Sequence, residues 1–258
     1  MTTSQVKTRV HELLQQMTLQ EKICQLGGHW FYEFQTQGRL DTEKVRVKLK
    51  HGIGQITRIA GSGNLSPLET AKAYNTIQKF LREETRLGIP AINHEECCSG
   101  VTALGGTVYP QMIGLASTFQ PELARQMTEQ IRRQMLAMGA RQGLAPVLDV
   151  GRDPRWGRIE ETFGEDPLLV TQFGKAYIQG LQGDDPLEGV MATGKHFVGH
   201  SFSQGGLNCG PVHLGERDLW DVYLQPFQAA IREAGLMSMM NAYPELDRLI
   251  ELLQKNKS

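Results

Sequence analysis

The chain repeats one order of elements: a short apolar stretch typical of a strand, a cluster of polar residues, and then an amphipathic helix. The apolar stretches lie at 53–59, 89–93, 144–150, 190–197 and 236–241, and a further one is expected near 23–27. Strands that alternate with helices in this way form parallel sheets with right-handed crossovers. The alternation therefore predicts an α/β fold, and because no low-complexity linker interrupts it we expect one domain.

The helix starts are marked by local capping signals. Thr18 with Glu21, and Ser66 with Glu69, have the spacing of a capping box, and Pro67 suits the first helical position. Apolar residues then recur at helical spacing on the face Ala73, Ile77, Phe80 and Leu81, and again on Leu123, Met127, Ile131 and Met135. Further helices are expected from Asp166-Pro167 to about 181 and over 216–233.

The number of strands decides between a complete and an incomplete barrel. At 258 residues the chain has the length of a complete (β/α)8 barrel, which is typically ~250 residues. Its loops at 94–110, 151–165 and 198–215 are long, however, and only about six βα units are found. The sequence therefore predicts an incomplete (β/α)8 TIM-barrel-like fold.

Composition excludes several classes of partner. The formal net charge of -1 gives no reason to expect nucleic acid or anionic lipid. No apolar run of about 18 residues exists, so no membrane span is expected. The first residues lack the apolar core of a signal peptide, so we expect a cytoplasmic location. The four cysteines lack CxxC spacing and are interpreted as small buried thiols.

Polar clusters follow four of the predicted strands, where barrel folds place their ligands. They are Asn93 to Glu96, Arg152 to Arg158 with Glu160-Glu161, Lys195-His196, and Asn241 to Tyr243. Any one of them could be structural; Arg152 and Asp153, for example, could simply pair across a turn. Four together favour a binding face for an uncharged, hydroxyl-bearing ring.

A metal site is the alternative for the histidines. His94, His196, His200 and His213 lie on loops that could converge near Glu95 and Glu96. The chain has neither a His-x-x-x-His helix pair nor Cys/His ligand spacing, so no metal and no cofactor is expected.

The run Arg-Asp-Pro-Arg-Trp-Gly-Arg at 152–158 and the run Lys-His-Phe-Val-Gly at 195–199 closely resemble the N-terminal barrel domain of glycoside hydrolase family 3, the β-glucosidases and β-xylosidases. The resemblance covers nearly all of 10–243. It implies that Glu96 accepts hydrogen bonds from sugar hydroxyls and that Arg158, Lys195 and His196 surround the same sugar and donate to it. It also implies that Tyr243 lies near the reacting carbon.

Neighbouring residues of these motifs are given structural roles. Glu161 is expected to fix its loop, and Asp166 to cap the following helix. Trp156 is interpreted as a packing residue under Arg158, with a platform for the sugar ring as the alternative.

The resemblance fails at the catalytic groups. Family members carry their nucleophile as an Asp in a Ser-Asp-Trp/Tyr motif, and no Ser-Asp pair occurs in this chain. The general acid usually comes from a second domain. No catalytic residue is therefore assigned. The chain is interpreted as a truncated barrel domain at 1–243 followed by an atypical tail at 244–258, in which Leu246, Leu249, Ile250 and Leu253 predict an amphipathic helix.

Two functions remain open. By resemblance, the parent reaction is retaining hydrolysis of terminal non-reducing β-D-glucosides or β-D-xylosides, with a small carbohydrate as the ligand. The alternative is a catalytically inactive sugar-binding or scaffold fragment. An open sheet would leave its edge strands unpaired, so we expect a homodimer or a partner chain that completes the barrel.

Overall fold

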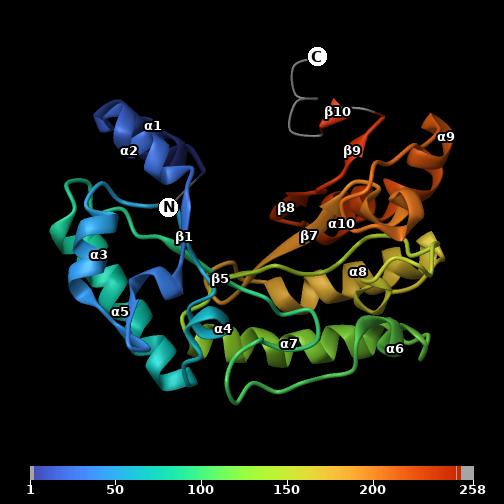
Figure 1. Ribbon diagram of the computed structural model, residues 1–258, viewed down its shortest axis with the longest axis horizontal. Coiled ribbons are helices and arrows are strands. Elements are labelled where there is room, and N and C mark those ends of the chain that lie inside the picture. Colours follow the sequence, from blue (N-terminus) through green and yellow to red (C-terminus); the bar gives the residue numbers. More distant parts are fainter. Residues whose placement is uncertain (1–2, 248, 251–258) are drawn as a thin grey trace. The chain divides into compact units, whose positions relative to one another are not determined.

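The structure is a computed structural model and describes residues 3–247 and 249–250. The chain divides into two compact units. The first is formed by 1–95 with 102–105 and 137–140, and the second by 96–101, 106–136 and 141–258. Figure 1 labels helices and strands of both units.

The first unit has three parallel strands: β1 (Gly28–Trp30), β4 (Gln55–Thr57) and β5 (Ile92–Glu95). β4 pairs with β1 on one side, Gln55 opposite Gly28, and with β5 on the other, Gln55 opposite Ile92. The remaining elements of the unit are α1 (Thr3–Gln16), α2 (Leu19–Gln25), η1 (Phe31–Phe34), β2 (Gln35–Thr36), β3 (Arg39–Leu40), α3 (Thr42–Leu49), α4 (Ile59–Gly63) and α5 (Pro67–Glu84).

Local sequence signals set the helix ends of this unit. Both predicted capping boxes are confirmed: Thr18 with Glu21 opens α2, and Ser66 with Glu69 opens α5. The face of α5 predicted to be apolar is buried against Phe31, Phe34 and the strand residue Ile56 in one core cluster.

The first strand begins later than predicted. Residues 23–25 belong to α2, because the capping box at Thr18 starts a helix that continues to Gln25, and β1 begins only at Gly28.

The second unit has three further parallel strands: β6 (Gln142–Gly143), β7 (Met191–Phe197) and β8 (Ser238–Asn241). β7 pairs with β6 through Met191 and Gln142, and with β8 through Thr193 and Ser238. Its other elements are α6 (Met112–Ala116), α7 (Pro121–Ala137), η2 (Ile159–Glu161), α8 (Pro167–Gln182), η3 (His200–Phe202), η4 (Gln204–Gly206), α9 (Glu216–Asp218), η5 (Leu219–Tyr223), α10 (Gln225–Ala234), β9 (Glu245–Leu246) and β10 (Leu249–Ile250).

The strand predicted at 144–150 is mostly irregular. Regular pairing is confined to β6 and a bridge between Val147 and Lys195. The segment still follows β7, because the N–H of Lys195 donates to the Pro146 carbonyl and the N–H of Leu148 to the Lys195 carbonyl. Pro146 lacks an N–H of its own, which limits a regular ladder at this point.

Two long helices pack on this unit, as the sequence predicts. Met127, Ile131 and Met135 of α7 are buried, whereas Leu123, predicted for the same face, is 36% exposed near the start of the helix. Asp166 caps α8 by accepting hydrogen bonds from two backbone N–H groups. The two helices lie close together at Gly180, where a Cβ would be 2.1 Å from the Thr128 hydroxyl oxygen.

The helix predicted over the tail is wrong for the part that the structure describes. β9 and β10 pair antiparallel, with Asp247 at positive φ in the turn between them. The Val212 N–H donates to the Glu245 carbonyl and the Asp247 N–H to the Val212 carbonyl, and this pairing favours extended backbone over a helix. Residues 251–258 lie outside the described residues.

The architecture is that of an incomplete (β/α)8 TIM-like barrel, as predicted: six parallel strands occur within residues 3–250, each followed by a loop or helix. None of the described helices is long and apolar enough to cross a membrane.

Candidate sugar-binding site

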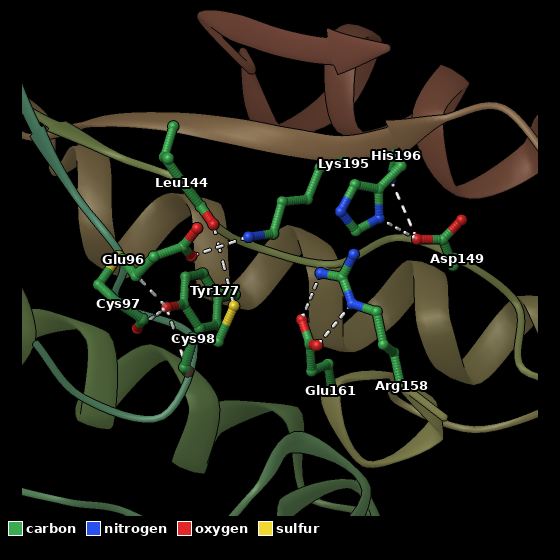
Figure 2. A network of polar contacts seen from close by, with 10 residues as sticks. All are labelled: Glu96, Cys97, Cys98, Leu144, Asp149, Arg158, Glu161, Tyr177, Lys195 and His196. Carbon is green, nitrogen blue, oxygen red and sulfur yellow. Dashed lines mark hydrogen bonds and ion pairs between the residues drawn. The ribbon is translucent and has the colours of Figure 1, made fainter. Parts of the chain in front are cut away.

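The five predicted site residues all belong to the second unit. Lys195 and His196 lie near the end of β7, Tyr243 follows β8, Arg158 immediately precedes η2, and Glu96 begins the loop 96–101. Figure 2 shows that four of them gather under β7, with Lys195 pointing toward Glu96 and the Arg158 guanidinium near the His196 ring.

Lys195 and Glu96 form an ion pair. The Lys195 Nζ lies 2.8 Å from Glu96 Oε2, and the lysine side chain is only 3% exposed, against 32% for the glutamate. Burial by itself lowers the pKa of Lys195, but the ion pair with the Glu96 carboxylate acts in the opposite direction, and the pKa is raised above its usual value. The ammonium is therefore charged at neutral pH and presents hydrogen-bond donors next to an acceptor.

Arg158 is held in place by Glu161. Its Nε and one terminal nitrogen donate to the two carboxylate oxygens at 2.7 and 2.8 Å, a bidentate pair. Burial of Glu161 acts to raise the pKa of its carboxyl, but the hydrogen bonds from Arg158 outweigh it and the pKa is lowered. The expectation that Glu161 fixes this loop agrees with this contact.

Trp156 packs under Arg158. The guanidinium carbon lies 5.9 Å from the centre of the indole ring, which is 1% exposed. The indole N–H donates to the Asn208 side chain at 3.3 Å. The packing role predicted for Trp156 is confirmed, because a ring buried to this extent cannot serve as an open platform.

His196 is bound to a residue that the sequence analysis did not select. Asp149 Oδ2 lies 2.8 Å from His196 Nδ1 and accepts the His196 backbone N–H at 3.0 Å. Both side chains are 1% exposed. The available signal was the position of Asp149, a single carboxylate inside the apolar stretch 144–150.

Aromatic rings surround the His196 imidazole. The ring centre of His200 lies 4.6 Å from it and that of Tyr243 lies 5.6 Å from it. Tyr243 is 49% exposed, so its ring borders solvent. Burial lowers the pKa of His200 to about 4, so this second imidazole is neutral at pH 7.

The cysteines differ in exposure. Cys97 is buried, Cys24 and Cys98 are of intermediate exposure, and Cys209 is exposed, so the expectation of buried thiols is confirmed for Cys97 and wrong for Cys209. Burial raises the pKa of Cys98 to about 11, which keeps its thiol protonated beside Lys195.

The arrangement suits a polyhydroxylated ligand. Lys195 and Arg158 supply donors, Glu96 supplies a carboxylate acceptor, and vicinal sugar hydroxyls both donate and accept.

The sequence analysis considered a metal site as the alternative, with His94 and His213 near this group. Among residues 3–247 and 249–250, no group of three or more His, Cys, Asp or Glu side chains is arranged to hold a metal ion.

Comparisons with known proteins agree with the motifs. Residues 18–251 match the model of the glycosyl hydrolase family 3 N-terminal domain. A putative β-xylosidase from Formosa agariphila is 34% identical over 94% of this chain, and β-glucosidase C from Emericella nidulans is 32% identical over 92%. The chain spans only 33% and 40% of the length of these two relatives.

Solved structures are similar over the same region. A β-glucosidase from Erythrobacter marinus superposes with a TM-score of 0.86 at 34% identity, over 94% of this chain and 32% of its own. A β-glucosidase from Listeria innocua gives 0.79 at 32% identity, over 93% of this chain and 33% of its own. Structures of the Listeria protein in complex with glucose and with isofagomine are also similar.

Proposed function

Because the chain belongs to glycosyl hydrolase family 3, we propose that its second unit binds the non-reducing sugar of a β-glucoside or β-xyloside. The observation that carries this proposal is the buried Lys195 paired with the half-buried Glu96, with the Arg158–Glu161 pair beside it. In these pairs an obligate donor lies next to an obligate acceptor. Neighbouring hydroxyls on a sugar ring both donate and accept hydrogen bonds, so they can bind to both members of such a pair. The ring of Tyr243, which is 49% exposed, lies 5.6 Å from the His196 imidazole on the exposed side of this group.

The reaction proposed for the complete protein is retaining hydrolysis of a terminal β-D-glycosidic bond. That mechanism needs two carboxyl groups about 5–5.5 Å apart, one a nucleophile and one a general acid. Three carboxylates lie near the proposed sugar: Glu96 and Glu161 are engaged in ion pairs with Lys195 and Arg158, and Asp149 is hydrogen-bonded to His196. We therefore assign these carboxylates to binding and positioning, and assign none of them the role of nucleophile.

Binding is tested by titration. Methyl β-glucoside and methyl β-xyloside, followed by NMR or calorimetry, are expected to bind no tighter than about millimolar. Glu96→Ala and Lys195→Ala should abolish the response. Lys175→Ala is the matched control, since Lys175 also pairs with a glutamate, Glu233 at 2.6 Å, but does so between α8 and α10. An equal response in all four proteins contradicts the assignment.

Catalysis is tested separately with nitrophenyl β-glucoside and nitrophenyl β-xyloside. We expect little or no turnover by the purified chain, because a missing catalytic carboxylate removes orders of magnitude in rate. Turnover comparable with ordinary glycosidases would show that two residues of this chain act as nucleophile and acid.

A second candidate function is an inactive sugar-binding or scaffold fragment that completes its barrel by association. The exposed edge strand of the second unit, β8, favours it. Met237 and Met239, beside and within β8, are 50% and 43% exposed. In the described residues β8 pairs with β7 alone. A second copy or a partner chain would bury this edge.

The cytoplasmic location expected from the sequence stays a prediction.

A further inference from the structure

Asp149 makes two hydrogen bonds to the same residue. A single carboxylate oxygen, Oδ2, accepts the backbone N–H of His196 at 3.0 Å and lies 2.8 Å from its Nδ1. An ionised carboxylate has no hydrogen to give, so this geometry requires the hydrogen of the neutral imidazole to be on Nδ1. Asp149, 47 positions earlier in the chain, thus determines the tautomer of His196.

The other ring nitrogen is left without a partner. His196 Nε2 is buried and makes no hydrogen bond within the described residues. The rings of His200 and Tyr243 pack near the imidazole, at 4.6 and 5.6 Å between centres, and together with the Asp149 bond they fix its orientation. A buried nitrogen with a lone pair and no partner needs a donor from outside the residues that the structure describes.

We infer that Asp149 is a positioning residue that holds His196 as the Nδ1–H tautomer, so that Nε2 accepts a hydrogen bond from one hydroxyl of the bound sugar. The hydroxyl part of this inference rests on the proposed function. It replaces the role expected from the sequence, in which His196 donates to the sugar. In this arrangement His196 accepts a hydrogen bond from the sugar, whereas Lys195 and Arg158 can only donate.

The tautomer is measured in the protein without sugar. In ¹⁵N NMR at neutral pH, the His196 signal is identified by its loss in His196→Gln. We expect a protonated, pyrrole-type shift at Nδ1 and an unprotonated, pyridine-type shift at Nε2. A proton on Nε2, either as the opposite tautomer or in a doubly protonated ring, overturns the inference.

Substitutions of Asp149 separate positioning from general stability. In Asp149→Asn the amide oxygen can still accept both hydrogen bonds, so the Nδ1–H tautomer and most of the sugar affinity should be kept. In Asp149→Ala the imidazole loses its acceptor, so both tautomers should be populated and sugar affinity should fall about tenfold, which corresponds to one hydrogen bond of about 1.4 kcal/mol. If Asp149→Ala does not fold, the wild-type and Asp149→Asn spectra decide the question.

The matched control is Asp153→Ala. Asp153 accepts hydrogen bonds from the backbone and side chain of Arg155 in the following loop, and its loss should leave the His196 shifts unchanged. A change of tautomer in Asp153→Ala equal to that in Asp149→Ala would mean that the shifts report a general disturbance, and the inference would fail.

The acceptor role is tested with a series of methyl β-glucosides in which one hydroxyl at a time is replaced by fluorine. Fluorine cannot donate, so one member of the series should bind wild type at least about tenfold more weakly. The same member should bind His196→Gln no more weakly than the parent glucoside does. If the parent sugar fails to bind wild type, the proposed function and the hydroxyl contact fail together, while the tautomer is still decided by NMR. If the parent binds and no member shows this pattern, the acceptor role alone is overturned.

Discussion

The hydroxyl of Tyr177, on α8, donates a 2.6 Å hydrogen bond to the backbone carbonyl of Cys97, the residue that follows Glu96. The same hydroxyl lies 3.3 Å from the Cys98 carbonyl. Tyr177 is fully buried and packs against Phe163. The loop that carries the proposed acceptor for a sugar is therefore bound to the core of the second unit by one phenolic hydroxyl.

Tyr177→Phe removes that bond and keeps the ring. We expect a loss of about 1 kcal/mol of unfolding free energy, since the Cys97 carbonyl loses a buried partner while packing is conserved. Urea unfolding measures the loss. The control is Tyr32→Phe, whose side chain is 55% exposed and should change the free energy by less than about 0.5 kcal/mol. Equal values for the two variants would mean that the Tyr177 bond contributes nothing.

The two partners of the Lys195–Glu96 pair should respond unequally to mutation. Glu96→Gln leaves a charged lysine that is almost completely buried, whereas Lys195→Met leaves a carboxylate that solvent still reaches. We expect a loss of about 2 kcal/mol for the first and less than about 1 kcal/mol for the second, because an unpaired buried charge is the costly product. Urea unfolding of both variants and of the double variant completes a double-mutant cycle. If the loss of unfolding free energy in the double variant equals the sum of the two single losses, Lys195 and Glu96 are not coupled.

His200 should make the protein less stable in mild acid. Its pKa is lowered by burial from 6.5 to about 4, so below pH 6.5 the unfolded chain binds a proton at this residue that the folded chain does not. The contribution of His200 to the unfolding free energy is fully present above pH 6.5. It falls by up to about 3 kcal/mol as the pH falls toward 4.

The measurement for His200 is urea unfolding at several pH values between 7.5 and 4. The difference between wild type and His200→Gln isolates this group from the other titrating residues. A difference that stays constant across this range would show that His200 is not protected from protonation by the fold.

Association is expected through the edge of the second unit. Light scattering at micromolar concentration should give twice the chain mass of 28.8 kDa. Met239→Lys should shift the protein toward monomer, because a charge would then face the shared apolar surface. Leu187→Lys is the control, since Leu187 is 80% exposed in a loop of the same unit. A wild-type monomer with a cooperative melt contradicts the prediction.

The sequence alone determined the helix starts and the family motifs. The caps of α2, α5 and α8 come from Thr18, Ser66 and Asp166, and each bond spans two or three residues. Such bonds form whenever the local backbone turns, so their pattern can be read directly from neighbouring residues. The Arg158–Glu161 pair is local in the same way, since its members are three residues apart, although the sequence analysis predicted only that Glu161 fixes its loop.

Tertiary structure decided the contacts that join distant segments. Lys195 and Glu96 are 99 positions apart, and Asp149 and His196 are 47 apart, so their pairing depends on how the segments of the second unit are brought together around β7. The tail shows the same dependence. The apolar spacing of 246–250 is compatible with a helix, but the backbone of Val212 offers hydrogen bonds to Glu245 and Asp247, and these favour extended strands there. A local apolar pattern cannot predict that choice, because the groups that decide it lie more than thirty residues away.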